Sequence, residues 1–219
     1  MIITIDGPAA AGKGTLAQRL AEKYKLAYFD TGMVYRAVGL DLVLNNFSPD
    51  DSEKAEKSAL SLTFPKMMSL SKHPDFRSNI GGQAASKVAA INEVRQALLK
   101  MQQDFAFDPQ FADGSKAQGV VYDGRDTGTV ICPNADIKLF ITASPEVRAM
   151  RRHKEFLGKG IASSYEEVLK QTKERDERDS SRSSAPLKPA DDAIIIDTSN
   201  LGIEEVYNRV CGIIESKKS

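Results

Sequence analysis

The stretch MIITIDGPAAAGKGT (residues 1–15) decides the fold of this 219-residue chain. Its apolar, largely β-branched residues at 2–5 predict a buried strand that ends at Asp6. A loop at 7–12, with glycine at both ends, comes next, and from Leu16 onward apolar residues recur at helical spacing. The stretch therefore predicts a strand, a glycine-rich loop and a helix in direct succession.

A strand, loop and helix of this kind form a candidate phosphate-binding site. Backbone N–H groups of the loop and of the helix N-terminus converge on an anion, and Lys13 would place a positive charge beside the β- and γ-phosphates. The hydroxyl of Thr15 would bind Mg²⁺ directly or through water. The common pattern is G-x-x-x-x-G-K-[ST], whereas Gly14 separates the lysine from the threonine here. A tight glycine turn without a ligand is the structural alternative.

The bulk properties of the chain exclude several classes of protein. Its 30 basic and 30 acidic side chains cancel, which predicts neither nucleic acid nor a membrane as a partner and requires any anion site to be local. Cys132 and Cys211 are too few and too far apart for a disulfide framework or a metal cluster, and the isolated His73 and His153 leave no histidine triad or zinc site. With no signal segment or membrane span visible, we expect a reduced, cytoplasmic, soluble enzyme.

The remaining elements follow from hydrophobic periodicity. Short apolar runs predict further strands at 26–30, 120–123, 137–142 and 193–197. Helical spacing predicts helices at 16–24, 33–44, 83–105, 145–157, 163–180 and from 203 onward. Residues 45–82 are less regular, and with strand-like patches at 60–64 and 67–70 they are interpreted as a small inserted subdomain. The alternation predicts an α/β fold with a five-stranded parallel sheet, helices on both faces, and ligands at the carboxyl ends of the strands.

Polar clusters follow the ends of the predicted strands. The segment DTG-x-x-YR ends at Arg36, after the second strand, and DGRD at 123–126 follows the third. A third cluster is KERDERDSSR at 173–182, in which Arg175, Asp179 and Arg182 share one helical face if the helix continues that far. Such a charge run is usually a solvated face with i,i+4 pairs. Two arginines around one aspartate would equally suit a ligand that carries a phosphate and hydroxyls.

Taken together, these motifs are similar to those of the bacterial cytidylate kinases, which transfer the γ-phosphoryl group of ATP to CMP or dCMP. The resemblance extends from residue 2 to about 197 and rests on GPAAAGKGT (7–15), DTGMVYR (30–36), AASKVA (84–89), DGRDTGTV (123–130) and KERDERD (173–179). The segment at 123–130 is specific, whereas the loop alone would indicate only a nucleoside monophosphate kinase. The implied fold is a three-layer P-loop kinase fold with a five-stranded parallel sheet, in one domain.

The resemblance also implies roles for individual residues, with ATP as phosphoryl donor and Mg²⁺ as cofactor. The residues that would hold ATP are Gly7, Pro8, Ala9, Ala10, Ala11, Gly12, Lys13, Gly14 and Thr15, the last also meeting Mg²⁺. The acceptor phosphate would be bound by Arg36, Arg125 and Arg182, the cytosine edge by Ser86, Arg95 and Asp126 with Thr31 nearby, and the pentose by Arg175 and Asp179. Lys13, Arg125 and Arg182 would act on the reacting phosphates.

The resemblance further divides the chain into parts. A monophosphate-binding subdomain would span about 58–87 and a moving lid about 151–162, with the core formed by 1–57, 88–150 and 163–219. Arg148, Arg151 and Arg152 would be lid arginines, or else a solvated face. Taken alone, Ser86 is a small packing residue and Arg95 a surface arginine. The chain departs from the family where Ala10 replaces a frequent glycine and Thr31 a frequent serine.

Two other functions remain open at this point. Another small-molecule P-loop kinase, acting on UMP, dTMP or shikimate, would share the first 25 residues but not the clusters at 123–130 and 175–182 together. A non-catalytic nucleotide-binding switch would use the loop alone, although no N-K-x-D motif is present. Without a heptad pattern or an exposed apolar stripe, we expect a monomer that acts in pyrimidine nucleotide metabolism.

Overall fold

The computed structural model describes residues 1–218 and contains one parallel sheet. Its strands are β1 (Ile2–Asp6), β2 (Ala27–Asp30), β3 (Val120–Gly124), β4 (Ile137–Thr142) and β5 (Ile194–Asp197). They lie in the order β2-β3-β1-β4-β5, and every neighbouring pair is parallel. The five strands predicted from apolar runs are all confirmed, each to within about a residue of its bounds.

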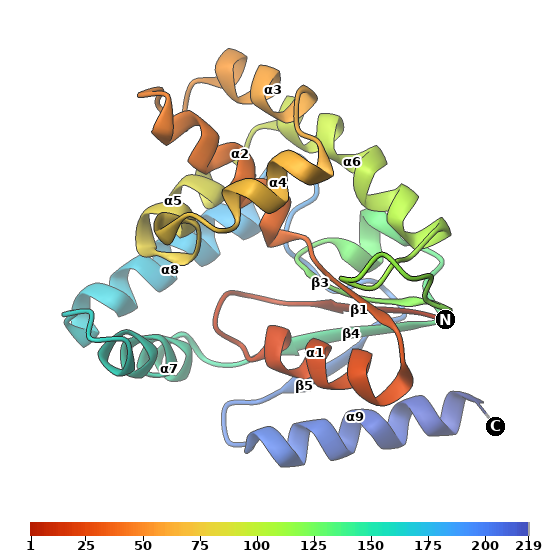
Figure 1. Ribbon diagram of the computed structural model, residues 1–219. Coiled ribbons are helices and arrows are strands. Elements are labelled where there is room, and N and C mark those ends of the chain that lie inside the picture. The colour runs from red at the N-terminus through yellow and green to blue at the C-terminus, as the bar shows by residue number, and fades with distance from the viewer. Residues whose placement is uncertain (219) are drawn as a thin grey trace.

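Helices cover both faces of the sheet and its carboxyl end (Figure 1). They are α1 (Lys13–Tyr24), α2 (Gly32–Leu44), α3 (Ser52–Leu60), α4 (Phe64–Leu70), α5 (Asn79–Val88), α6 (Asn92–Phe107), α7 (Pro145–Gly158), α8 (Tyr165–Ser181) and α9 (Ile203–Lys218). Two short turns, η1 (Pro74–Arg77) and the π-type η2 (Thr127–Ile131), complete the structure. No helix within the described residues is long and apolar enough to cross a membrane.

The alternation of side chains along the strands builds two cores. Val121 of β3 packs with α1 and α9 on one face, whereas its neighbours Val120 and Tyr122 pack with α2, α3 and α6 on the other. Side chains of successive strand residues point to opposite faces, so a short apolar run serves both cores. The predicted three-layer arrangement is therefore confirmed.

The strand-like patches predicted at 60–64 and 67–70 are wrong, because this region is helical. The first patch covers the end of α3 and the loop after it, and the second lies inside α4. The carboxylate of Asp51 accepts a hydrogen bond from the Lys54 N–H at 3.0 Å, and the Thr63 hydroxyl accepts one from the Lys66 N–H at 3.3 Å. These N-caps start both helices, and their apolar residues pack on α2.

The single long helix predicted from 83 to 105 is also divided in two. The helix α5 starts earlier, at Asn79, and the chain turns at 89–91 before α6 begins. The Ala89 carbonyl accepts a hydrogen bond from the Arg95 guanidinium at 3.2 Å, and Ile91 is extended (φ −83°, ψ 120°). The break thus coincides with a side-chain to main-chain hydrogen bond across the turn, which the periodicity of the sequence does not contain.

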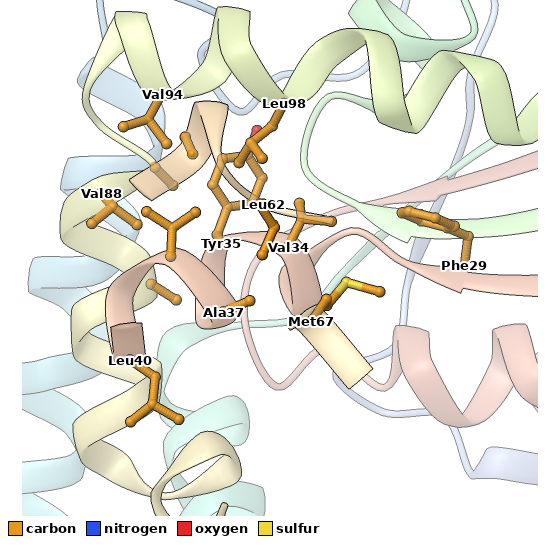
Figure 2. Packing of buried hydrophobic residues seen from close by; sticks show 14 of the residues in the cluster. Phe29, Val34, Tyr35, Ala37, Leu40, Leu62, Met67, Val88, Val94 and Leu98 are labelled. Carbon is orange, nitrogen blue, oxygen red and sulfur yellow. The ribbon is translucent and has the colours of Figure 1, made fainter. Parts of the chain in front are cut away.

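The close approach of α2 and α5 holds the inserted helices on the core. Figure 2 shows Tyr35 of α2 close to Leu98 of α6, with Val94 of α6 and Val88 of α5 on the same side and Leu40 further along α2. A Cβ atom on Gly39 would lie 2.8 Å from the carbonyl carbon of Ala84 and 2.9 Å from its Cβ. The two helix backbones can therefore pack at this distance only with glycine at position 39.

We expect Gly39→Ala to destabilise the protein, with Gly82→Ala as the matched control. Both changes add a methyl group, and both favour the helix by the same free energy, up to about 1 kcal/mol. They differ in their surroundings, because a Cβ on Gly82 meets nothing within 4 Å. Overpacking costs about 1–3 kcal/mol, so the free energy of unfolding of Gly39→Ala should be lower than that of Gly82→Ala by about that amount. Urea denaturation followed by circular dichroism measures both, and equal stabilities would contradict the predicted clash.

Candidate functional site

A cavity of about 910 Å³ lies at the carboxyl end of the sheet, beside α5, α7 and α8. Its wall includes every residue proposed from the sequence for ATP or acceptor binding except Gly7 and Pro8. These residues come from segments as far apart in the chain as the first loop and the end of α8. The structure therefore brings the three polar clusters to one place, as expected for a parallel sheet.

The loop after β1 has the backbone conformation that its glycines permit. A Cβ atom on Gly7 (φ 145°) would lie 1.9 Å from the Ile141 carbonyl oxygen, so β4 leaves no room for a side chain there. Gly12 lies at φ 93° and directly precedes α1. Ala10 lies at φ 60°, a left-handed conformation that costs an alanine about 1–2 kcal/mol. The loop is therefore strained at Ala10, where the resemblance led us to expect glycine.

Lys13 folds back over this loop. Its side chain is only 5% exposed, and its Nζ donates a hydrogen bond to the Pro8 carbonyl at 3.0 Å and lies 3.6 Å from a carboxylate oxygen of Asp123. Burial, aided by repulsion from Arg125, lowers the pKa of the Lys13 ammonium to about 8. A phosphate in the loop would reverse this effect, because an adjacent anion favours the charged ammonium.

Asp6 does not line the cavity but supports it, and the sequence alone did not single it out. Its buried carboxylate accepts hydrogen bonds from the Thr127 N–H at 2.9 Å, the Thr127 hydroxyl at 2.8 Å and the Gly128 N–H at 2.8 Å. Burial raises its pKa to about 6. Asp6 thereby fixes the segment after β3 to the start of the phosphate-binding loop. An acidic residue at the end of an apolar strand, just before such a loop, is the signal that could have identified it.

A buried ion pair joins Arg95 of α6 to Asp126. Arg95 is 6% exposed and Asp126 is 3% exposed, so the interpretation of Arg95 as a surface arginine is wrong. The Arg95 guanidinium also lies 5.4 Å from the centroid of the Tyr35 ring. Both charged groups line the cavity, which leaves the Asp126 carboxylate available to a polar ligand there.

Two hydroxyl groups lie near this pair. Ser86 of α5 is buried and lines the cavity, and its Oγ accepts a hydrogen bond from Arg178 of α8 at 2.9 Å. Thr31 is also buried, and its hydroxyl donates to the Asp123 carbonyl at 2.9 Å. Ser86 therefore packs between helices and faces the cavity at the same time, which reconciles the two interpretations made from the sequence.

The arginines of α8 and of the segment after β3 surround Asp179. The Nε of Arg125 donates to the Asp179 carboxylate at 3.0 Å, and the Nε of Arg175 lies 3.9 Å from it. Arg182 donates to the Ala185 carbonyl at 2.8 Å. The helix ends at Ser181, so Arg182 follows its last turn and the predicted common helical face is only partly confirmed.

Several of these arginines have unused hydrogen-bonding capacity. The Nε atoms of Arg36, Arg175 and Arg182 are buried without a hydrogen-bond partner among the described residues. Burial lowers the pKa of all three guanidinium groups, that of Arg175 to about 10 with repulsion from Arg125 as the next cause. Unpaired buried donors and crowded positive charge are both relieved by an anion. An anion in the cavity would therefore relieve the cluster on both counts.

The wall of the cavity is strongly basic although the chain as a whole is neutral. Ten basic side chains line it: Lys13, Arg19, Arg36, Arg77, Arg95, Arg125, Arg151, Arg152, Arg175 and Arg182. Five acidic side chains line it: Asp30, Asp123, Asp126, Glu155 and Asp179. The excess positive charge is local, as the sequence required, and it extends from the phosphate-binding loop to the far end of the cavity.

The predicted lid arginines differ in their contacts. Arg148 is buried and donates to the Ala9 carbonyl at 3.2 Å and to Asp176 at 2.9 Å. Arg151 donates to the Thr198 carbonyl at 2.7 Å, whereas the Arg152 guanidinium lies over the Phe156 ring at 4.4 Å. Arg148 and Arg151 thus anchor α7 to the core instead of forming a solvated face. The division into a lid at 151–162 and a subdomain at 58–87 stays a prediction.

The residues present fit a magnesium ion that is held mainly through phosphates. Within the described residues no group of three or more His, Cys, Asp and Glu side chains could hold a metal by itself. Thr15 is exposed at the start of α1 and lines the cavity. Mg²⁺ usually keeps several waters and takes one or two protein ligands beside substrate phosphates, which one hydroxyl in this position would satisfy.

Comparison with known proteins gives a consistent result. The family model described as cytidylate kinase matches residues 3–216. The cytidylate kinase of Paramagnetospirillum magneticum is 50% identical over 217 residues, covering 99% of each chain. That of Xanthobacter autotrophicus is 48% identical over 220 residues, covering 100% of this chain and 99% of the relative. A crystal structure of an uncharacterized protein from Eubacterium ventriosum has a TM-score of 0.52 at 14% identity, with 99% of both chains covered, which indicates a similar fold alone.

The strained loop yields a stability prediction, in which Ala10→Gly stabilises the ligand-free protein. Glycine adopts positive φ without steric cost, but it loses more backbone entropy on folding than alanine does. The relief of strain is the larger effect, so we expect the free energy of unfolding to rise by about 0.5–1 kcal/mol. Ala9→Gly, at a neighbouring position without positive φ, should instead lose about that amount. Thermal denaturation of both variants checks this, and a loss of stability in Ala10→Gly would contradict the strain.

Proposed function

The chain belongs to the cytidylate kinase family, and on that premise we propose that it transfers the γ-phosphoryl group of ATP to CMP or dCMP, giving ADP and CDP or dCDP. This reaction belongs to pyrimidine nucleotide metabolism. The observation that carries the proposal is the continuity of the cavity, which joins the phosphate-binding loop to the buried Arg95–Asp126 pair and to the arginines of α8. Transfer between two nucleotides needs both in one space that excludes water.

The donor nucleotide would be held by residues 7–15. The loop N–H groups and the N-terminus of α1 would cradle its phosphates, and Lys13 would neutralise charge at the β- and γ-positions. The buried position of Lys13 within this loop supports that role. Thr15 would hold Mg²⁺, which supplies further neutralisation of the phosphate charge when bound.

The acceptor phosphate would be bound by Arg36, Arg125 and Arg182. The unpartnered Nε atoms of Arg36 and Arg182 support this role, because an anion would satisfy them. Arg175 and Asp179 would hold the pentose hydroxyls, since a guanidinium donates hydrogen bonds and a carboxylate accepts them. Asp179 is already positioned by Arg125 at 3.0 Å.

The base would be identified at the Arg95–Asp126 pair. Cytosine carries an exocyclic amino group, and a carboxylate accepts hydrogen bonds from it. Asp126 is buried and oriented by Arg95, so its position is defined before the ligand arrives. Ser86 and Thr31 would complete the pocket around the base.

The chemistry requires alignment and charge neutralisation from the protein. An oxygen of the acceptor phosphate attacks the γ-phosphorus of ATP, and the bond from that phosphorus to the bridging oxygen of ADP breaks. The second pKa of a phosphate ester is about 6, so the attacking oxygen is largely ionised at neutral pH and no general base is needed. Lys13, Arg125 and Arg182 would stabilise the charge on the transferring group. Closure of a lid at 151–162 and of the subdomain at 58–87 would exclude water.

The monomeric state, the cytoplasmic location and the absence of a nucleic acid partner stay predictions from the sequence.

An assay of ADP release with ATP and Mg²⁺ against CMP, dCMP, UMP, AMP and dTMP tests the proposal. We expect turnover mainly with CMP and dCMP. In the same assay Asp126→Asn, which keeps the shape of the side chain and an acceptor for Arg95, should raise KM for CMP about 10- to 100-fold, the loss expected for one charge-assisted hydrogen bond. Its KM for ATP should change less than about twofold.

The other outcomes of that assay are equally informative. A preference for UMP or dTMP would assign the chain to another small-molecule kinase. Tight ATP or GTP binding without turnover of any acceptor would favour a nucleotide-binding switch. Equal losses for CMP and ATP in Asp126→Asn would show that Asp126 is structural.

The lowered pKa of Lys13 predicts proton uptake when ATP binds. Without ligand its pKa is about 8, so the amine is mostly neutral at about pH 8.5, and the triphosphate should raise that pKa and recruit a proton. Uptake should decrease toward pH 7, where Lys13 is already protonated. Calorimetry at pH 8.5 in buffers of different ionisation enthalpy measures the uptake, and Lys13→Met should abolish it. Buffer-independent binding enthalpies in the unmodified protein would contradict the prediction.

A further inference from the structure

Arg178 contacts the candidate site only through Ser86. Its Nη1 donates to the Ser86 Oγ at 2.9 Å and so links α8 to α5, helices that lie against one another (Figure 1). Among the described residues that line the cavity, Ser86 is present and Arg178 is absent. Arg178 is partly buried, and Ser86 is 3% exposed. The serine hydroxyl is therefore the hydrogen-bonded link between this arginine and a ligand in the cavity.

This contact biases the way in which the hydroxyl acts. A guanidinium is a donor with no acceptor, whereas a serine hydroxyl has one proton to donate and two lone pairs to accept. Arg178 occupies one lone pair of Ser86, and the positive charge beside the oxygen weakens the other lone pair as an acceptor and strengthens the O–H as a donor. Within the described residues, no hydrogen bond donated by this hydroxyl to the protein is present. Ser86 is thereby biased toward donating into the cavity that it lines.

A donor at Ser86 and an acceptor at Asp126 distinguish the two common pyrimidines. Cytosine presents an amino donor and, beside it, a ring nitrogen that accepts. Uracil presents the reverse, a carbonyl acceptor beside a ring N–H donor. The ionised carboxylate of Asp126 only accepts, so the pair complements cytosine and opposes uracil at both positions.

We propose that Arg178 is a positioning residue that biases Ser86 toward hydrogen-bond donation and thereby strengthens the preference of the acceptor site for cytidine over uridine monophosphates. This inference rests on the proposed function and adds a residue that sets its specificity. Sites that hydrogen-bond a polar group reject analogues that lack it, because the buried partner is left unpaired. A hydroxyl free to rotate would accept from the uracil N–H as readily as it donates to cytosine.

The test compares kcat/KM for CMP and UMP in the unmodified enzyme, Arg178→Met and Arg178→Lys. We expect Arg178→Met to lower the CMP-to-UMP ratio about tenfold, the effect of one hydrogen bond, mainly through KM for CMP, with KM for ATP unchanged within about twofold. Arg178→Lys should restore part of the ratio, since an ammonium can donate to the same oxygen. Lys170→Met removes a charge from the same helix at an exposed side chain 4.0 Å from Glu174, and should leave the ratio unchanged.

A double-substitution cycle separates this role from a general contribution to folding. In a Ser86→Ala background Arg178→Met should cause no further fall in the ratio, because the hydroxyl that it orients is gone. An unchanged ratio in Arg178→Met alone, or an equal fall in both backgrounds, would overturn the inference. If the methionine variant fails to fold, as judged by circular dichroism, Arg178→Lys carries the same comparison. An unmodified enzyme inactive toward CMP and dCMP would instead contradict the proposed function itself.

Discussion

The buried carboxylate of Asp6 is the constraint on which the site depends. It ends β1, the central strand of the sheet, and its main chain pairs with Gly124 of β3. Its oxygens hold Thr127 and Gly128, while the next residue begins the phosphate-binding loop. One side chain thus places the segment that would bind the acceptor relative to the loop that would bind the donor. Phosphoryl transfer needs that alignment, and a displacement of about 1 Å is costly.

The burial of this carboxylate has an energetic cost that its hydrogen bonds offset only in part. Its folded-state pKa of about 6 lies above the ordinary 3.8, so protonation favours the folded chain. That contribution is complete below pH 3.8 and is lost as the pH rises through 6. At neutral pH the ionised group is held by three donors, two of them backbone N–H groups. Hydrogen bonds of this kind are what allow a charged group to remain buried.

Much of this site could be predicted from the sequence because its chemistry is local. Glycines, Lys13 and Thr15 occur in one short motif after one apolar run, and five such runs are enough to indicate a parallel sheet with its ligands at one end. The missing parts depend on side-chain contacts that hydrophobic periodicity does not record. Some are short-range, such as the Arg95 hydrogen bond to the Ala89 carbonyl at the break between α5 and α6 and the N-caps of the helices at 52–70. Others join distant segments. The partners of Asp6 and Arg178 lie more than 90 residues away in the chain, so periodicity gives no sign of them.

The same long-range contacts make the two halves of the cavity interdependent. Arg148 bridges the Ala9 carbonyl in the donor loop and Asp176 on α8, and the next turn of that helix carries Asp179. From the same helix Arg178 reaches Ser86 on α5. The helix α8 is therefore linked to the loop after β1 through Arg148 of α7 and to α5 directly, while Arg175 and Asp179 line the cavity between these contacts. If Arg182 binds the acceptor phosphate and Ser86 the base, as proposed above, one end of α8 carries a residue of the first subsite and a partner of the second. Charge neutralisation and base selection would then be linked through one helix.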